Sequence, residues 1–200
     1  MSTDSVNIKS KHAKYLTGNP ISKYLVGNFF NRVNVVIRGM EFNSIVDIGC
    51  GEGLLLSSLK DFIKEKKCFA IDLDETEVKD ATVNLPFCSV RVGSAEEIPL
   101  DDNSFDFVTC TEVLEHCTNP YKALSEIHRV SNKFVLLSVP REPIWRILNL
   151  IRFSYIKDFG NTPGHLNHWS SRSFEKFVSS KFKVIKVSHS LPWTIILAEK

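Results

Sequence analysis

The sequence predicts an α/β protein in which helices pack on both faces of a mainly parallel β-sheet. Strand-like and helix-like segments alternate through the middle of the chain, and the strand-like segments are near-continuous apolar runs, such as FVLLSV at 134–139. Runs of this kind are typical of strands that helices bury on both faces. With 200 residues, of which 43% are hydrophobic, the chain is large enough for one hydrophobic core.

Seven segments have the composition of strands. In chain order they are 44–50, 67–73, 88–93, 104–110, 132–140, 181–188 and 194–200. Apolar residues recur at helical spacing at 54–67, after the first strand, and at 121–130, between the fourth and the fifth. The last two strands are separated by a segment too short for a crossover helix, so we expect the sheet to end with an antiparallel strand.

The two ends of this pattern predict additions to the sheet. Residues 1–40 are expected to form an N-terminal helical cap, with Pro20 near the start of its helix, and residues 41–200 to form the main domain. The insertion at 141–170, after the fifth strand, is long for a connection in a compact domain, which is typical of lids and binding loops. It begins with apolar residues interleaved with arginines, which predicts a basic amphipathic helix. That helix is either a lid over a ligand or a membrane surface, or a helix packed on the core with its arginines in solvent.

A glycine-rich turn, VDIGCGEG at 46–53, joins the first strand to its helix. The glycines that leave room for a ligand to approach the backbone are Gly49, Gly51 and Gly53. Their spacing differs from the G-x-G-x-x-G of dinucleotide sites, and the turn contains the carboxylates Asp47 and Glu52. Because carboxylates repel a pyrophosphate and attract an ammonium or sulfonium group, the turn predicts a ligand that carries positive charge.

The second strand ends in Ile-Asp-Leu-Asp, which places Asp72 19 residues after Gly53. An acidic residue at about this distance reaches the ribose hydroxyls of a bound nucleoside. A ribose together with a cationic group suggests S-adenosylmethionine. In these motifs, in VGSAEEIPLDDNSFDFVTCTEVLEH at 92–116 and in KFVLLSVP at 133–140, the sequence resembles the class I S-adenosylmethionine-dependent methyltransferases, especially the small-molecule group that includes ubiquinone-biosynthesis methyltransferases.

The resemblance implies a Rossmann-like, doubly wound sheet of seven strands and a role for each residue that matches the family's motifs. Asp72 would hold the ribose hydroxyls, Leu73 would lie against the adenine, and Tyr15 would close over the methionine carboxylate. The residues implied to bind the cofactor are Tyr15, Asp47, Gly49, Cys50, Gly51, Gly53, Asp72, Leu73, Ser94, Ala95, Thr111, Glu112 and Val113. Many relatives have aspartate where this chain has Ser94, so the hydrogen bond to the adenine amino group is expected to be weaker or to come from the backbone.

Glu112, Glu115 and His116, after the fourth strand, have a spacing that allows two interpretations. If the segment is helical, the two carboxylates share a face beside the imidazole and can bind a divalent ion. In ubiquinone O-methyltransferases and small-RNA 2′-O-methyltransferases similar Glu-x-x-Glu-His runs hold a metal, and His165 or His168 could supply a further ligand here. In the second interpretation, which we adopt because many methyltransferases of this group have the run without a known metal, Glu115 caps or pairs locally and His116 shapes the pocket.

These observations favour an enzyme that transfers a methyl group from S-adenosylmethionine to a small, hydrophobic or cyclic acceptor. If the acceptor is a hydroxyl, His116 and then His165 are the candidate catalytic bases, because imidazole titrates near neutrality. The candidate acceptor-binding residues are Trp145, Arg146, His168 and Trp169. The alternatives are a regulatory or scaffold protein that binds the cofactor without catalysis, and a methyltransferase that acts on protein or nucleic acid.

Charge and targeting signals limit the partners and the location. The formal net charge of +2 is small for a protein whose main task is to bind a phosphate backbone, so we expect no nucleic-acid partner. The first residues are polar and lack the apolar stretch of a signal peptide, and no apolar run approaches the length of a membrane span. We therefore expect a cytoplasmic protein, with peripheral membrane contact left open.

Overall fold

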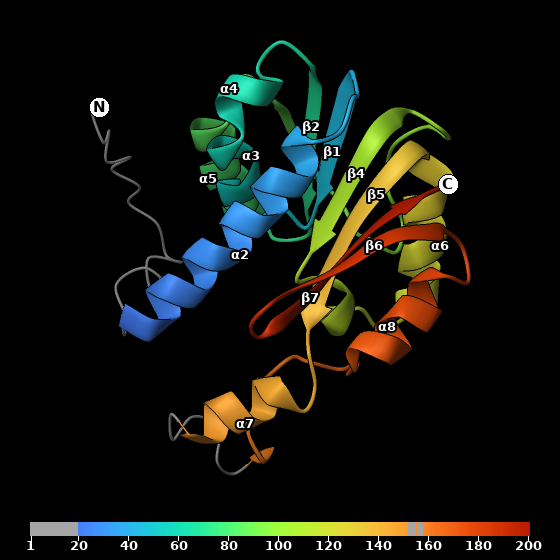
Figure 1. Cartoon of the computed structure of the whole chain (residues 1–200). Coiled ribbons are helices and arrows are strands. Elements are labelled where there is room, and N and C mark those ends of the chain that lie inside the picture. Colours follow the sequence, from blue (N-terminus) through green and yellow to red (C-terminus); the bar gives the residue numbers. More distant parts are fainter. Residues whose placement is uncertain (1–19, 152–154, 156–157) are drawn as a thin grey trace.

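The computed structural model describes residues 20–151, 155 and 158–200, and it confirms the predicted α/β architecture. One seven-stranded sheet has the strand order β3-β2-β1-β4-β5-β7-β6 (Figure 1). The strands are β1 (Ser44–Ile48), β2 (Lys67–Asp72), β3 (Ser89–Val92), β4 (Phe105–Thr111), β5 (Ser131–Pro140), β6 (Lys183–Ser190) and β7 (Trp193–Glu199). The helices are α2 (Pro20–Arg38), α3 (Leu54–Ser58), α4 (Lys60–Ile63), α5 (Glu75–Asn84), the short 3₁₀ helix η1 (Leu114–His116), α6 (Pro120–Val130), α7 (Ile144–Ile151) and α8 (Ser171–Val178).

The pairing of the strands confirms a parallel sheet with one antiparallel strand. β1 pairs in parallel with β2 and β4, β2 with β3, and β4 with β5, whereas β7 runs antiparallel to both of its neighbours, β5 and β6. The strand order reverses between β1 and β4. Open α/β sheets bind ligands outside the carboxyl ends of the strands at such a reversal. The turns that follow β1, β2 and β4 therefore lie where a ligand site is expected.

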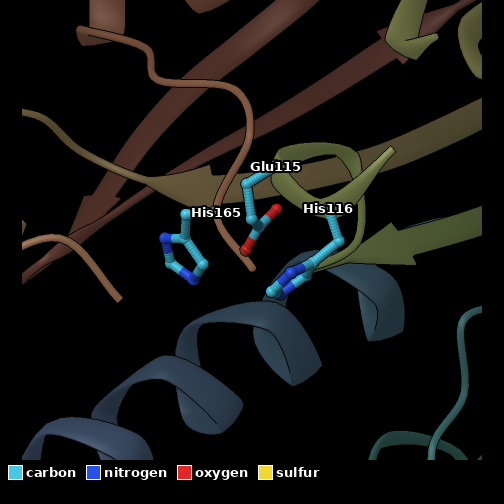
Figure 2. Close-up of side chains that lie close together, drawn as sticks. All are labelled: Glu115, His116 and His165. Atoms are coloured by element: carbon cyan, nitrogen blue, oxygen red, sulfur yellow. The ribbon is translucent and has the colours of Figure 1, made fainter. Parts of the chain in front are cut away.

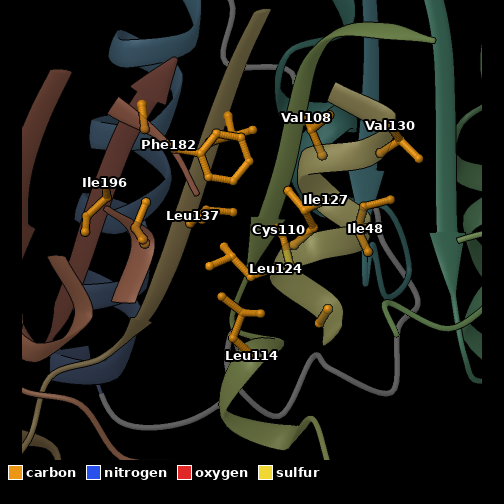
Figure 3. Close-up of a cluster of buried hydrophobic side chains, with 14 of the residues drawn as sticks. Ile48, Val108, Cys110, Leu114, Leu124, Ile127, Val130, Leu137, Phe182 and Ile196 are labelled. Carbon is orange, nitrogen blue, oxygen red and sulfur yellow. The ribbon is translucent and has the colours of Figure 1, made fainter. Parts of the chain in front are cut away.

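Helices cover both faces of the sheet, and each face has its own hydrophobic core. On one face α6 and α8 pack on the sheet, and buried residues such as Leu124 and Ile127 lie there (Figure 3). On the other face are α2, α3, α4 and α5, with Val33 fully buried among them. Alternate residues of one strand reach the two cores, since Leu137 of β5 joins the first and Leu136 the second.

The described part of the N-terminal cap is a layer of the main core. Pro20 begins α2, at the position where its missing N–H costs nothing. Phe29, Val33 and Ile37, one helical turn apart, are buried against the sheet. α2 therefore stands as one wall of the main domain.

The prediction of one continuous helix at 54–67 is wrong, because the chain forms two short helices that meet at Leu59. The N–H of Leu59 bonds to the carbonyl of Leu56, three residues back, which tightens the turn and ends α3. Leu56, Leu59 and Ile63 are all fully buried. The apolar pattern is therefore the same across the break as in an unbroken helix, and it could not reveal the turn.

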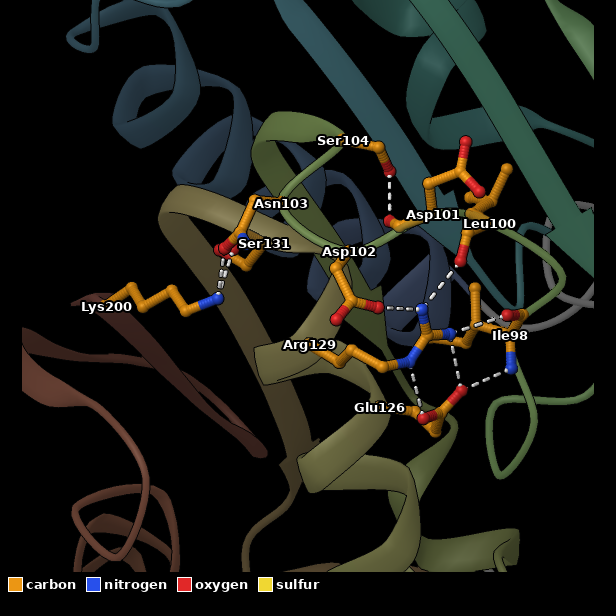
Figure 4. Close-up of polar contacts among 10 residues, drawn as sticks. All are labelled: Ile98, Leu100, Asp101, Asp102, Asn103, Ser104, Glu126, Arg129, Ser131 and Lys200. Atoms are coloured by element: carbon orange, nitrogen blue, oxygen red, sulfur yellow. Dashed lines mark hydrogen bonds and ion pairs between the residues drawn. The ribbon is translucent and has the colours of Figure 1, made fainter.

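Arg129 of α6 closes the connection between β3 and β4. Its guanidinium donates to the carbonyls of Ile98 and Leu100 and pairs with the carboxylates of Glu126 and Asp102 (Figure 4). Arginine can make all of these bonds because its planar group carries five N–H donors. These contacts hold the connection whose first residues the family resemblance assigns to the adenine edge.

The insertion after β5 is folded back on itself around α7, which is shorter than the predicted amphipathic stretch. The indole N–H of Trp145 donates to the hydroxyl oxygen of Thr162 at 2.9 Å, and the amide of Asn149 donates to the carbonyl of Gly160 at 2.9 Å. These bonds join α7 to the segment that returns to the sheet. No helix in the described ranges, α7 included, has the length and apolar character needed to cross a membrane.

Candidate functional site

Two hollows meet at the carboxyl ends of β1, β2 and β4. The larger has a volume of about 740 Å³, and its walls come from the glycine turn, the segment after β4, α2 and the insertion. The smaller is walled by the end of β2, the residues after β3 and the segment after β4. Both hollows share Gly49, Gly51, Glu112 and His116. Together they form one elongated site around the glycine turn.

The glycine turn needs glycine for two different reasons. Gly49 has a φ of +74°, and a Cβ at this position would lie 2.1 Å from a methyl carbon of Val113. Gly51 has a φ of +53°, but a Cβ there would meet only the Glu77 carboxylate, at 3.8 Å. Gly49 therefore serves the packing of the protein, whereas Gly51 keeps its backbone open to the site.

The residues at the end of β2 fit a nucleoside. The Asp72 carboxylate accepts the N–H of Gly51 at 2.7 Å and the N–H of Asp74 at 3.0 Å, which joins the end of β2 to the glycine turn. Each carboxylate oxygen can accept more than one hydrogen bond, so the ribose hydroxyls could also donate to Asp72. Leu73, beside it, is 72% exposed in the smaller hollow. An exposed apolar side chain next to a carboxylate matches an adenosine, which presents a flat ring beside a diol.

The residues after β3 are placed at the same hollow. Ser94 and Ala95 both line it, as the family resemblance implies. The Ser94 hydroxyl accepts the N–H of Glu96 at 3.1 Å, so it is already engaged in its own turn. This arrangement fits the expectation that the adenine amino group is held weakly by this side chain or by the backbone.

Two buried carboxyl groups at the glycine turn suit a cationic ligand. Asp47 is 2% exposed, and its carboxylate accepts the Thr109 hydroxyl at 2.7 Å across the β1–β4 pairing. Burial raises the pKa of Asp47 to about 7, the Thr109 hydrogen bond opposes this, and the charge of Asp72 adds to it. Glu52 is also buried, and its Oε1 has no hydrogen-bond partner among the described residues. An ammonium or sulfonium group would supply the missing partner.

Glu112 is placed differently from the prediction. It lies before η1 with a φ of +60°, so it does not share a helical face with Glu115. The Glu112 carboxylate instead accepts the Ser138 hydroxyl at 3.0 Å and the indole N–H of Trp193. Burial raises the pKa of Glu112 to about 8, against the effect of these two hydrogen bonds. The predicted metal site of Glu112, Glu115 and His116 is therefore wrong, because Glu112 points to a different set of partners.

The structure brings His165 of the insertion to Glu115 and His116 instead (Figure 2). Their potential ligand atoms all lie within 4.8 Å of one another. Glu115 is 1% exposed, and neither oxygen of its carboxyl group has a hydrogen-bond partner in the described part of the chain. The interpretation that Glu115 caps or pairs locally is therefore wrong: its backbone carbonyl accepts two N–H groups of the insertion, while its side chain bonds to none of the described residues.

The charges of this cluster follow from its burial. Burial raises the pKa of Glu115 well above its usual value, with the Glu112 carboxylate adding to the effect. Burial lowers the pKa of His165 to about 4, with His116 and His168 adding to the effect. His116 is exposed, and its Nδ1 lies 2.9 Å from the carbonyl oxygen of Gly164. Because a carbonyl oxygen only accepts, Nδ1 carries the hydrogen and the lone pair of the neutral ring is on Nε2.

Among the predicted acceptor-binding residues, only Trp145 is part of the cavity wall. Arg146 lies 3.5 Å from the Glu142 carboxylate, and the Nε2 of His168 lies 2.8 Å from the side-chain oxygen of Asn161. Trp169 packs on the phenylalanines of α8, which is the structural role of an ordinary buried tryptophan. Tyr15 lies outside the described residues.

Four aromatic residues form a wall that the sequence did not reveal as a unit. Phe29 and Phe30 come from α2, Trp145 from α7 and Trp193 from the start of β7. The ring of Trp193 lies 4.9 Å from that of Phe29 and 5.9 Å from that of Trp145, so it connects the two helices. Phe29 showed a signal as part of the apolar series of α2, whereas nothing in the sequence marked Trp193 as a site residue.

Comparisons with known proteins agree with this geometry. Residues 46–135 match the family model described as a methyltransferase domain. A probable S-adenosylmethionine-dependent methyltransferase of Mycolicibacterium smegmatis is 30% identical over 143 residues, which make up 68% of this chain and 52% of that protein. A ubiquinone biosynthesis O-methyltransferase of Xanthomonas oryzae pv. oryzae is 33% identical over 120 residues, or 56% of this chain and 49% of that protein. This chain thus spans about half the length of these two relatives.

The fold comparison extends over almost the whole chain. The magnesium protoporphyrin IX methyltransferase of Synechocystis PCC 6803, solved with bound S-adenosylhomocysteine, has a TM-score of 0.69. The superposition covers 92% of this chain and 88% of that one at 17% sequence identity. Likeness at this identity shows the fold, including the antiparallel β7.

Proposed function

We propose, starting from the fact that the chain belongs to the class I S-adenosylmethionine-dependent methyltransferases, that it transfers a methyl group from this cofactor to a small acceptor. The observation that carries the proposal is the placement of the glycine turn. It lies where the strand order reverses, and it joins a hollow that fits a nucleoside to a larger hollow with aromatic walls. A donor and an acceptor can meet at such a junction.

The residues of this chain fit the cofactor at three points. Asp72 and Leu73 would hold the ribose and the adenine, and the open backbone of Gly51 would lie against the ligand. Asp47 and Glu52 would face its cationic groups, because both are buried acids at the junction. When bound, S-adenosylmethionine supplies a methyl group activated by a sulfonium. Such a reaction needs mainly alignment of the reactants and exclusion of water, which can lower the barrier by roughly 7–11 kcal/mol.

The larger hollow supports an apolar, flat and uncharged acceptor. Phe29, Phe30, Trp145 and Trp193 offer ring faces on which a planar group can stack. Neither lysine nor arginine is found among the described residues that line this hollow. An acceptor with a carboxylate or phosphate at this point would meet acidic groups without a counter-charge.

His116 is placed to take the proton of an acceptor hydroxyl. Its Nδ1–H is held by the Gly164 carbonyl, which leaves the Nε2 lone pair available at the junction of the two hollows. The hydroxyl proton would pass to Nε2 as the oxygen gains its methyl group. His165 is the second candidate, because its lowered pKa keeps the ring neutral at pH 7.

A second candidate role for Glu115, His116 and His165 is to hold a divalent cation that orients the acceptor oxygen. The specific observation in its favour is the buried Glu115 carboxyl group, whose two oxygens lack partners in the described ranges and lie close to two imidazoles. One carboxylate and two imidazoles suit zinc, manganese or iron. The two roles exclude each other at His116 Nε2, because a lone pair that binds a metal cannot accept a proton. Removal of metal abolishes transfer in the second role and leaves it intact in the first.

The proposed function is tested with methyl-labelled S-adenosylmethionine and an extract of the source cells. The purified protein is incubated with both, with and without a chelator, and the products are separated into organic-soluble, aqueous, protein and nucleic-acid fractions. We expect label in the organic fraction. Label confined to protein or nucleic acid would contradict the small acceptor, and cofactor binding without transfer to any fraction would support a regulatory protein instead.

A further inference from the structure

Exposed apolar side chains surround the larger hollow on two separate elements. On α2 the side chain is Tyr24, and in the insertion they are Ile147, Leu150, Ile151 and Phe159, with exposed fractions between 39% and 79%. Both elements supply walls of the hollow, α2 through Val26 and Phe30 and the insertion through Trp145 and Pro163. Figure 1 shows α7 beyond the end of the sheet, with the first turns of α2 also extending past it. We call these five exposed residues the α2–α7 rim.

The two elements that carry the rim are also the basic part of the chain. Segments 20–38 and 141–170 contain seven lysines and arginines but only two acidic residues, Glu142 and Asp158. Their combined formal charge is therefore +5, in a chain whose total is +2, so the rest of the chain has −3. One of the two acids, Glu142, lies 3.5 Å from Arg146 and is largely buried. Positive charge is therefore concentrated in the segments that carry the apolar rim.

A small water-soluble acceptor explains neither feature. Burying apolar side chains is favourable, so a group of them left in water around a cavity mouth indicates a surface that covers them. A protein partner would need apolar contact but no excess of basic charge. An anionic lipid surface needs both, because apolar side chains enter the boundary of the acyl chains while lysine and arginine meet the headgroups.

We propose that the α2–α7 rim docks on an anionic lipid surface, with the mouth of the larger hollow facing the lipid. This surface is the source of the acceptor, an amphiphile whose ring enters the aromatic hollow while its apolar tail stays in the membrane. The second part rests on the proposed function, whereas the docking itself does not. The absence of a membrane-spanning helix among the described residues agrees with attachment by a surface.

The test is co-sedimentation of the full chain with vesicles of phosphatidylcholine alone or mixed with phosphatidylglycerol. The variant Ile147→Asp/Ile151→Asp places two charges on one exposed face of α7, four residues apart. Val83→Asp is the matched control, because Val83 is 79% exposed on α5, away from the rim. We expect wild type and Val83→Asp to bind the anionic vesicles, to bind neutral ones weakly, and to be released by salt. The double variant should partition at least about tenfold less.

Three results would overturn the docking: no binding of wild type to anionic vesicles, equal binding of the double variant, or a wild-type dimer that the double variant disrupts. The last would show that a second copy covers the rim. S-adenosylhomocysteine binding is measured on the same proteins, and its absence in wild type would count against the proposed function without affecting the vesicle result. With vesicles of source-cell lipids and labelled cofactor, label in the lipid fraction should fall in the double variant and persist in Val83→Asp; an equal yield from both would overturn the lipid acceptor.

Discussion

Substituting Gly51 and Gly49 by alanine should have opposite consequences, although the two residues lie in the same turn. Both have positive φ, so alanine costs about 1–2 kcal/mol of backbone energy at either position. At Gly51 the added Cβ meets only a carboxylate oxygen at 3.8 Å, and the total cost stays near this value. At Gly49 the Cβ would overlap Val113 at 2.1 Å, which adds about 1–3 kcal/mol of overpacking. Gly51→Ala should therefore be the more stable variant.

Ligand binding should show the reverse order of defects per unit of lost stability. The Cβ of Gly51→Ala enters the space in which the cofactor meets the backbone, so we expect S-adenosylhomocysteine to bind at least about tenfold more weakly. Calorimetric titration measures the affinity, and thermal unfolding measures the stability, with a fall of about 2–8 °C expected for Gly51→Ala. Gly27→Ala, in a helix with open space around its Cβ, should raise stability by about 1 kcal/mol and serves as the control.

Two outcomes would refute this reasoning. Wild-type affinity in Gly51→Ala would show that the ligand does not approach the glycine turn. Equal stability of Gly49→Ala and Gly51→Ala would show that the contact with Val113 does not constrain the turn.

Three further predictions concern charge and the acceptor wall. Because the raised pKa values of Asp47 (about 7) and Glu112 (about 8) make these groups ionise near neutrality, affinity for cationic S-adenosylmethionine should rise from pH 6 to pH 9, while that for uncharged-sulfur S-adenosylhomocysteine should rise less; parallel titration curves would contradict this. Since the unfolded chain loses these protons near pH 4, the free energy of unfolding should fall as pH rises from about 4 to 8, by up to roughly 4 kcal/mol per group. Glu112→Gln should flatten this fall in denaturant titrations, and an unchanged slope would contradict the assignment. Trp145→Ala should lower kcat/KM for the acceptor about tenfold without changing cofactor affinity, with Arg146→Ala, outside the cavity wall, as the control; equal losses in both would show that α7 acts only as a support.

The sequence predicted the sheet and the cofactor half of the site because both depend on local signals. The apolar runs marked the strands, and the glycine turn and Asp72 belong to consecutive strand ends of a parallel sheet. These residues meet wherever such a sheet forms. The break at Leu59 was missed because the buried residues keep their helical spacing through it.

The acceptor half depends on contacts between distant segments, which periodicity does not encode. His165 reaches Glu115 because the insertion folds back and its backbone bonds to the turn after β4. Glu112 departs from the predicted helical face because it adopts a positive φ, which is uncommon for a residue with a Cβ. Trp193 joins the wall through the reversal between β6 and β7. None of these placements follows from the neighbouring residues alone.

The most direct test of the central claim is a crystal structure of the protein with S-adenosylhomocysteine. The account predicts the adenine against Leu73, the ribose hydroxyls donating to Asp72, and the sulfur at the junction beside the glycine turn, facing the aromatic hollow. A ligand bound elsewhere, or a glycine turn without contact to it, would contradict the assignment of this site.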